Sequence, residues 1–239
     1  MENIDNKTVA EIVTENIKTA DVFKKNGIDF CCGGHVSVQE ICAKKGVDYA
    51  TLKEEILKIG GTPKNAHDFS TWELDFLADY IINTHHKYVV EANTIITQYA
   101  EKVAKVHGHH YTEVVEINEL FKEIAAELNS HMRKEEMILF PHIKEMALAK
   151  KEGKNIPTPA FGSIQNPITM MEDEHTGAGD ILRKIAELSN NYTPPTGACN
   201  TFRALYNKLE EYQNDLFQHI HLENNILFPK AILLEKELI

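Results

Sequence analysis

The sequence predicts an all-α protein in which a four-helix bundle follows a small helical domain. Three observations predict this class. Apolar residues recur at helical spacing through most of the 239 residues. Four of the predicted helices are long, and short polar segments that contain glycine or proline join them. A stretch that begins at His131 also recurs, with the same key residue types, from His219.

Residues 1–62 form the predicted N-terminal domain, which consists of short helices. The apolar spacing places these helices at residues 8–14, 19–26, 37–45 and 49–59. Ser37 and Glu40 have the spacing of a capping box, which would start the third of them. The second and third helices flank a glycine-rich turn, Asp29-Phe-Cys-Cys-Gly-Gly34. Its glycines permit the backbone to turn and to approach another group closely.

Residues 63–239 form the predicted bundle, and the polar segment from Gly60 to Ser70 marks the boundary. The four long helices are expected at residues 71–107, 113–149, 167–188 and 198–234. At about 1.5 Å per residue the first would be roughly 50 Å long, which is a bundle length. Connections rich in glycine and proline separate them, so the helices are expected to run up, down, up and down.

The repeated stretch places a histidine four residues before a glutamate: His131 before Glu135 and His219 before Glu223. On a helix four residues advance by about 400° and roughly 6 Å, so the two side chains of a pair can converge on one point. Two such helices that face each other would offer two imidazoles and two carboxylates to a common centre.

Each copy of the stretch ends in Ile-Leu-Phe-Pro, with Pro141 and Pro229 six residues after the glutamate. Proline removes a backbone donor and clashes with the preceding turn of a helix. We therefore expect a kink or a helix end near each proline.

The two remaining long helices each carry a histidine at a matching distance. His86 precedes His131 by 45 positions, and His175 precedes His219 by 44. These near-equal spacings predict that both histidines lie at a similar depth in a bundle of two similar hairpins. His85 is adjacent to His86, and the spacing alone leaves either of them as the candidate.

Four imidazoles and two carboxylates suit two first-row transition metal ions. If both glutamates bridge, each ion receives two histidine nitrogens and two carboxylate oxygens, and an added oxo or hydroxo bridge still leaves coordination space. Ions bridged in this way lie about 3.5–4 Å apart. The donor set favours iron over magnesium, calcium or structural zinc, and the sequence leaves manganese and other zinc sites open. A repeat kept only for helix packing is the alternative.

Composition and charge exclude several classes of protein. The net charge is −11 and the pI is near 5.5, with no dense cluster of Lys and Arg, which argues against nucleic-acid binding. No secretory signal is visible, and no apolar stretch approaches the roughly 20 residues of a membrane helix. Four cysteines, two of them adjacent, do not make a disulfide framework for this length. We expect a cytoplasmic protein without a membrane or nucleic-acid partner.

The cysteine turn of the N-terminal domain and the repeated His and Glu stretch resemble those of the repair of iron centres (RIC) family of di-iron proteins. This resemblance covers nearly the whole chain. The Cys31-Cys32 motif resembles that of a ScdA-type N-terminal domain. The doubled His-x-x-x-Glu-x-x-Ile-Leu-Phe-Pro stretch, with Met171-Glu-Asp-Glu-His175, resembles a hemerythrin-like four-helix bundle. The resemblance implies a non-haem, oxo- or hydroxo-bridged site for two Fe that helps to restore iron–sulfur clusters damaged by nitric oxide or oxidants. Its implied metal ligands are His86, His131, Glu135, His175, His219 and Glu223.

Further residues are candidates outside the metal ligands. The resemblance places His107 near the centre but not among the ligands. Glu174, which precedes a ligand, is a candidate to hydrogen-bond behind one or to relay protons, and a solvated helix residue is the alternative. Glu136 has no acidic counterpart in the second copy, and it is not included. Cys31 and Cys32 precede a helix start, which predicts a lowered thiol pKa and a role in binding or passing iron, NO or electrons. Two small residues buried in a tight loop are the alternative for these cysteines.

The primary functional hypothesis is a di-iron stress protein that repairs iron–sulfur clusters, by donating iron or by handling NO. Damaged iron–sulfur proteins would be transient partners, NO or O2 would be ligands, and the family suggests a homodimer. The alternatives are an O2 or NO sensor or carrier, an NO reductase or peroxide-consuming enzyme, and a helical protein without metal. A simple carrier would not need the Cys-Cys-Gly-Gly domain.

Overall fold

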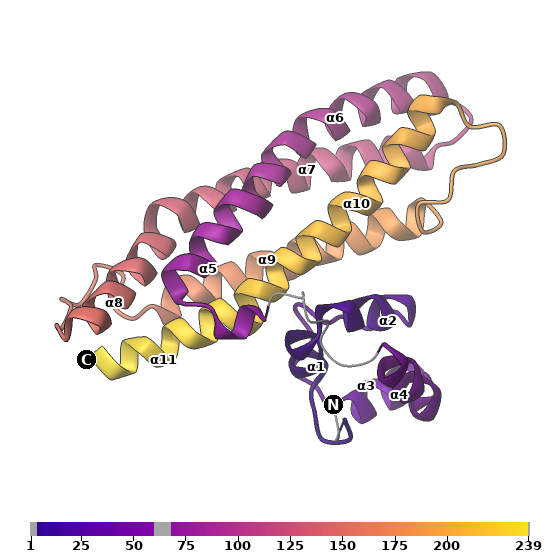
Figure 1. Ribbon diagram of the computed structural model, residues 1–239. Coiled ribbons are helices and arrows are strands. Elements are labelled where there is room, and N and C mark those ends of the chain that lie inside the picture. The colour runs from indigo at the N-terminus through magenta and orange to yellow at the C-terminus, as the bar shows by residue number, and fades with distance from the viewer. Residues whose placement is uncertain (1–3, 60–67, 239) are drawn as a thin grey trace.

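The computed structural model describes residues 4–59 and 68–238, and within these ranges the regular elements are helical. One antiparallel bridge, between Thr8 and Ser37, is the exception there. Figure 1 shows a small helical N-terminal domain beside a long four-helix bundle. The all-α prediction is therefore confirmed. The predicted boundary between residues 62 and 63 lies outside the described residues.

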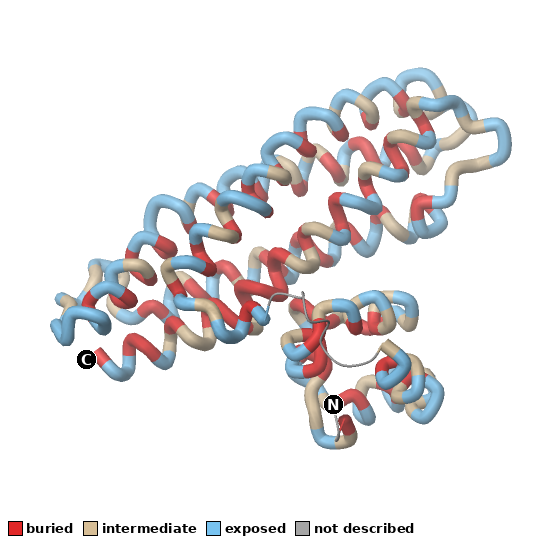
Figure 2. Tube along the Cα trace, in the orientation of Figure 1, coloured by how far each residue is buried: buried red, intermediate tan, exposed pale blue. Residues whose placement is uncertain are grey.

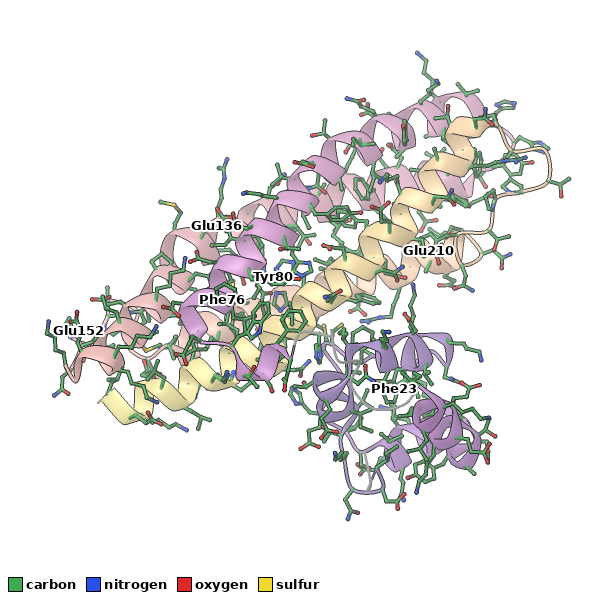
Figure 3. All side chains as sticks on the ribbon, in the orientation of Figure 1. Phe23, Phe76, Tyr80, Glu136, Glu152 and Glu210 are labelled. Carbon is green, nitrogen blue, oxygen red and sulfur yellow. The ribbon has the colours of Figure 1, made fainter. Side chains whose placement is uncertain are left out.

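The N-terminal domain contains short helices close to the predicted positions. They are α1 (Val9–Glu15), the 3-10 turn η1 (Ile17–Thr19), α2 (Ala20–Lys25), α3 (Val38–Lys45) and α4 (Tyr49–Lys58). Thr8 and Ser37 each accept the N–H of the residue three positions on, Glu11 and Glu40, whose carboxylates accept the N–H of the cap. The predicted capping box at Ser37 is confirmed, and Thr8 forms a second one. Phe23, labelled in Figure 3, is fully buried among these helices.

The bundle consists of four helical segments, three of which change their winding part of the way along. Its elements are the 3-10 turn η2 (Phe69–Thr71), α5 (Leu74–Ile81), η3 (Ile82–His86), α6 (Lys87–His107), α7 (Glu113–Lys134), η4 (Glu135–Leu139), α8 (Phe140–Glu152), α9 (Gln165–Leu188), α10 (Asn200–Leu222), η5 (Glu223–Leu227) and α11 (Phe228–Leu238). Helix α6 contacts α7 and α10, and α9 contacts the same two helices. Each of these four helices therefore packs against two others, and the four segments form a closed bundle. None of the described helices is long and apolar enough to cross a membrane.

The elements η3, η4 and η5 are π turns of five residues each. In each turn a backbone N–H donates to the carbonyl five residues earlier: Lys87 to Ile82, Phe140 to Glu135 and Phe228 to Glu223. Pro141 and Pro229 are the second residues of α8 and α11, so neither can donate a backbone N–H to the π turn that precedes it. The irregularity predicted at the prolines therefore takes the form of a π turn, and the helix continues beyond it.

The apolar core is divided at the level of the π turns. One cluster fills the bundle between α6, α7, α9 and α10 and extends into the N-terminal domain, and the second lies among α5, α8, α11 and the start of α9. In both clusters the buried residues lie on the inward faces of the helices (Figure 2). The residues between the two clusters are polar and buried, and they form the site described next.

Candidate metal centre

The predicted histidines and glutamates meet in the interior of the bundle. They form two groups that share both carboxylates: His86, Glu135, His219 and Glu223, and His131, Glu135, His175 and Glu223. Within each group, one ligand atom of every residue lies within 4.8 Å of the others. All six side chains are 2% exposed or less. The structure thus brings together every residue that the sequence analysis proposed as a ligand.

The imidazoles turn their Nε2 atoms toward the carboxylates. The Nε2-to-oxygen distances are 3.0 Å for His219 and Glu223, 3.2 Å for His175 and Glu223, 3.3 Å for His131 and Glu135, and 3.4 Å for His86 and Glu135. His131 and His175 also bring their Nε2 atoms to 3.0 Å from each other. A cation in either group would meet two nitrogens and two carboxylate oxygens, supplied by three of the four helical segments.

The electrostatics of this cluster favour positive charge between the two glutamates. Burial raises the pKa of the Glu223 carboxyl, but the neighbouring imidazoles of His219 and His175 outweigh burial and hold this pKa well below its usual range. Burial lowers the pKa of the His86 imidazole, but Glu135 and Glu223 outweigh it and raise this pKa to about 10. Protons therefore balance the carboxylates in the metal-free protein, and a bound metal would take their place.

Several buried atoms of the cluster fit a cation. Both carboxylate oxygens of Glu135, Oε2 of Glu223 and Nε2 of His86 have no hydrogen-bond partner among the described residues. Unpartnered polar atoms in a dry interior cost about 1–3 kcal/mol each. Imidazole nitrogen and carboxylate oxygen together are donors that first-row transition metals accept. The residues therefore fit a metal site on their own chemistry.

Three of the four histidines also contact a polar side chain through Nδ1, the outer ring nitrogen that faces away from the carboxylates. The Nδ1 contacts are 2.8 Å each, from His86 to Glu136 Oε1, from His131 to Glu174 Oε2 and from His175 to Asn224 Oδ1. When Nδ1 donates its hydrogen, Nε2 keeps a lone pair for a metal. The contact expected for Glu174 is present, and Lys134 pairs with the same carboxylate.

Sequence reasoning missed Glu136 and Asn224. Each stands directly after the glutamate of its copy, so their shared register was the signal that could have found them. A comparison by charge hides this correspondence, because one copy has a carboxylate and the other an amide. Figure 3 labels Glu136 on its helix.

The two adjacent histidines, His85 and His86, have different surroundings. His85 is buried, but its Nδ1 lies 3.0 Å from Asp215 Oδ1. Its ring stacks on that of His219, with 5.5 Å between centroids. The structure places His86, and not His85, in the candidate ligand group.

The prediction that His107 lies near the centre is wrong. His107 ends α6, which is 21 residues long and begins directly after His86. A helix of that length separates them by roughly 30 Å. The His107 Nε2 instead lies 3.3 Å from Cys199 Sγ, and its ring packs edge-on against Phe202.

The Cys31–Cys32 turn lies against η5 of the bundle. The Asn225 side-chain amide donates to the Cys31 carbonyl at 3.2 Å, and the Asn224 amide lies 3.4 Å from the same oxygen. Because Asn224 also contacts His175, a chain of hydrogen bonds joins the turn to the candidate ligands. The N-terminal domain (lower right in Figure 1) is thus in polar contact with the centre.

The prediction of a lowered thiol pKa is wrong for Cys31. Its contact with Cys32 (3.7 Å between sulfurs), its burial and the nearby Asp29 raise the pKa of this thiol well above its usual range. The backbone N–H groups of both cysteines donate to Asp29 Oδ1, at 2.9 and 3.0 Å, and so are not directed at the sulfur atoms. Asp29, Cys31 and Cys32 nevertheless form a third group of potential metal ligands.

Comparisons with known proteins match both parts of the chain. Residues 77–231 match the hemerythrin HHE cation binding domain, and residues 5–59 match ScdA_N, a domain of unknown function. The chain is 34% identical to the iron-sulfur cluster repair protein YtfE of Edwardsiella ictaluri, over 95% of this chain and 96% of that protein. It is 32% identical to the iron-sulfur cluster repair protein ScdA of Staphylococcus haemolyticus, over 93% and 96%.

The YtfE protein of Yersinia pseudotuberculosis is similar to the same degree, at 34% identity over 95% of this chain and 97% of that protein. These relatives match the chain across the N-terminal domain and the bundle together. The buried histidines and glutamates lie within the matched hemerythrin region. The chain therefore belongs to the hemerythrin HHE family and, within it, to the YtfE and ScdA group whose members carry a ScdA-type N-terminal domain.

Proposed function

We propose that this protein repairs iron–sulfur clusters damaged by nitrosative or oxidative stress, and that a non-haem di-iron centre is its working group. The observation that carries the proposal is the pair of four-residue groups that share Glu135 and Glu223. Because each group offers two nitrogens and two carboxylate oxygens, the site suits two ions better than one. The relatives reported above are iron-sulfur cluster repair proteins by name.

In this proposal the two glutamates bridge both metal positions. One iron would be held by His86 and His219, and the other by His131 and His175. When bound, the irons supply exchange between ferric and ferrous states and open positions for NO or O2. The chain aims three of the imidazoles inward with a lone pair at Nε2 for a metal, since Glu136, Glu174 and Asn224 accept the hydrogen at their Nδ1 atoms.

A cavity beside the centre supports access of a small ligand to this site. It measures about 390 Å³, lies between α7 and α9, and is lined by His131 and Glu174 among others. Gly177 and Ala178 contribute little side-chain volume to its wall. Space next to a ligand histidine favours a site that admits a small ligand over a sealed structural site.

The test begins with anaerobic reconstitution, for which we expect about two irons per chain. The loaded protein is then incubated with an iron–sulfur protein whose cluster has been damaged by NO, and cluster absorbance is followed. The double variant Glu135→Gln, Glu223→Gln should bind little iron and restore no cluster. Glu123→Gln, which removes an exposed charge from α7, the helix that leads into Glu135, is the matched control. Fewer than about one iron per wild-type chain would overturn the di-iron proposal.

A second candidate function is an enzyme that reduces NO. The observation that favours it is the hydrogen-bonded chain from the Cys31 carbonyl through Asn224 to His175, which joins the turn that carries the two thiols to a candidate ligand. Anaerobic incubation with NO and a reductant separates the candidates, because an enzyme consumes many equivalents of NO per chain. Replacement of Cys31 and Cys32 by serine should then slow NO consumption, whereas unchanged rates would contradict a role for the thiols.

A further inference from the structure

The two halves of the bundle repeat one another residue by residue around the candidate centre. The first half is α5 to α8, and the second is α9 to α11. At an offset of 88 or 89 positions, the pairs are His86 with His175, His131 with His219, Glu135 with Glu223, Glu136 with Asn224, and His85 with Glu174. Two symmetric halves would provide the same outer contacts for both metal positions.

The outer contacts within each half follow this repeat. Glu136 contacts Nδ1 of His86, and Asn224 contacts Nδ1 of His175, both at 2.8 Å. In each half, therefore, the residue after the glutamate orients the histidine of the preceding helix.

The outer contacts between the halves do not follow the repeat. Glu174 reaches from the second half to Nδ1 of His131, at 2.8 Å, and its carboxylate is held by Lys134 as well. The equivalent contact would run from position 85 to Nδ1 of His219. A histidine stands at that position in place of the glutamate.

His85 does not replace the missing contact. Its Nδ1 lies against Asp215, and its ring is parallel to that of His219, with an interplanar angle of 9°. His219 Nδ1 has no hydrogen-bond partner among the described residues, although this side chain is only 1% exposed. His219 is therefore the one candidate ligand histidine in the described chain without an outer partner.

The consequence differs for the two groups of ligands. His131 and His175 are both oriented, by a carboxylate and an amide. In the other group only His86 has a polar partner at Nδ1, and the Nδ1 of His219 has none among the described residues. Loss of one such outer partner typically lowers metal affinity by about 10–100-fold.

On the basis of the di-iron function proposed above, we propose that the two metal positions are unequal and that the ion between His86 and His219 is the one that exchanges. The ion between His131 and His175 is retained. In a repair reaction the protein donates the ion between His86 and His219. The ion between His131 and His175 stays bound and keeps the bundle closed around the empty position.

The direct test uses iron alone. Wild-type protein is loaded anaerobically with two ferrous ions, a ferrous chelator is added, and release is followed by absorbance. We expect two phases of about one iron each, with rates at least about tenfold apart. Crystals of the half-depleted protein should show iron by anomalous scattering between His131 and His175. A single phase, or iron that remains between His86 and His219, would overturn the inference.

Variants of the unequal pair provide an independent test. Glu174→Gln removes the carboxylate behind His131 and should speed the slow phase about tenfold. Asp173→Asn removes an equal charge from an exposed neighbour and should leave both phases unchanged. His85→Glu restores the carboxylate of the repeat and should slow the fast phase. Since this variant buries a new charge and can fail to fold, an unchanged slow phase in Glu174→Gln is the result that contradicts the inference.

Failure of the inference and failure of the proposed function give different results. A protein that releases its irons in the predicted order but restores no cluster contradicts the repair function and leaves the inference standing. A protein that restores clusters and releases both irons in one phase contradicts the inference alone.

Discussion

Adjacent residues on a helix can have unrelated roles, and His85 and His86 are such a pair. Both are 2% exposed. One helical position turns a side chain by about 100°, so His86 faces the glutamates while His85 faces Asp215. Their difference is therefore one of direction and not of burial.

We predict that His86→Gln lowers the iron content to about one per chain or less, because one metal position loses a ligand. His85→Gln should retain two irons, since it removes no ligand atom. Iron and protein are measured on the same anaerobically reconstituted samples. The reverse pattern, with iron lost only from His85→Gln, would show that His85 is the ligand.

Contacts between side chains of one helix could be predicted from the sequence, whereas contacts between side chains of different helices could not. Four positions on one helix fix the geometry of His131 and Glu135, so spacing was enough to pair them. The contact of Glu136 with His86 depends on how two helices are rotated against each other, which spacing does not record. The raised thiol pKa of Cys31 was missed for a different, local reason: Cys32 contacts the Cys31 sulfur, the thiol is buried, and Asp29 occupies the N–H groups expected to stabilise a thiolate.

At the scale of elements, the N-terminal domain depends on two helix starts that lie side by side. Thr8 and Ser37 are both N-caps, and an antiparallel bridge joins them. Helices α1 and α3 are 7 and 8 residues long. Helices this short have little intrinsic stability, so their caps matter more than in the long bundle helices.

We predict that Ser37→Ala lowers the free energy of unfolding of the N-terminal domain by about 1 kcal/mol, since the Glu40 N–H loses the Ser37 hydroxyl as its acceptor. Urea denaturation followed by circular dichroism measures the change. Ser130→Ala, at an exposed position within α7, is the control and should change stability little. Equal midpoints for wild type and Ser37→Ala would contradict the importance of the cap.

The lengths and order of the helices followed from apolar spacing, but their change of winding did not. Pro141 and Pro229 indicated only that something irregular must occur nearby. The π turns begin at Glu135 and Glu223, ahead of the prolines. The turn η3 has no proline after it, so no residue type marks it in the sequence.

At the scale of the whole molecule, the N-terminal domain docks through single residues. Phe30 packs edge-on against Phe217 and His221, with 6.2 and 5.9 Å between ring centroids. Asn225 donates to Nδ1 of His221, whose Nε2 lies 3.4 Å from the Thr14 hydroxyl. No periodic pattern marks such contacts, so the sequence could predict two domains but not how they meet.

Docking should weaken in acid because His221 must stay neutral. Burial lowers its pKa to about 4, against about 6.5 in an unfolded chain. Between these values the unfolded state binds the extra proton, so stability falls as the pH falls. We predict a loss of about 2 kcal/mol from this residue between pH 7 and pH 5 in metal-free protein. His221→Gln should lack that part of the loss, and an identical pH dependence in denaturant titrations would contradict the assignment.

Metal removal should destabilise the whole bundle. A ligand present at about a thousandfold above its Kd stabilises the folded state by about 4 kcal/mol. We therefore predict a clearly lower Tm after chelation than with iron, measured by calorimetry. The double variant Glu135→Gln, Glu223→Gln should show no such difference. A wild-type Tm that is the same with and without iron would contradict a metal site in the bundle.

The sharing of ligands between the halves has a mechanical consequence. Each four-residue group takes two side chains from α5–α8 and two from α9–α11. Two bound ions would therefore cross-link the two hairpins, independently of the connection between residues 152 and 165. A backbone cut in that connection would leave two fragments that remain associated for as long as both ions stay bound.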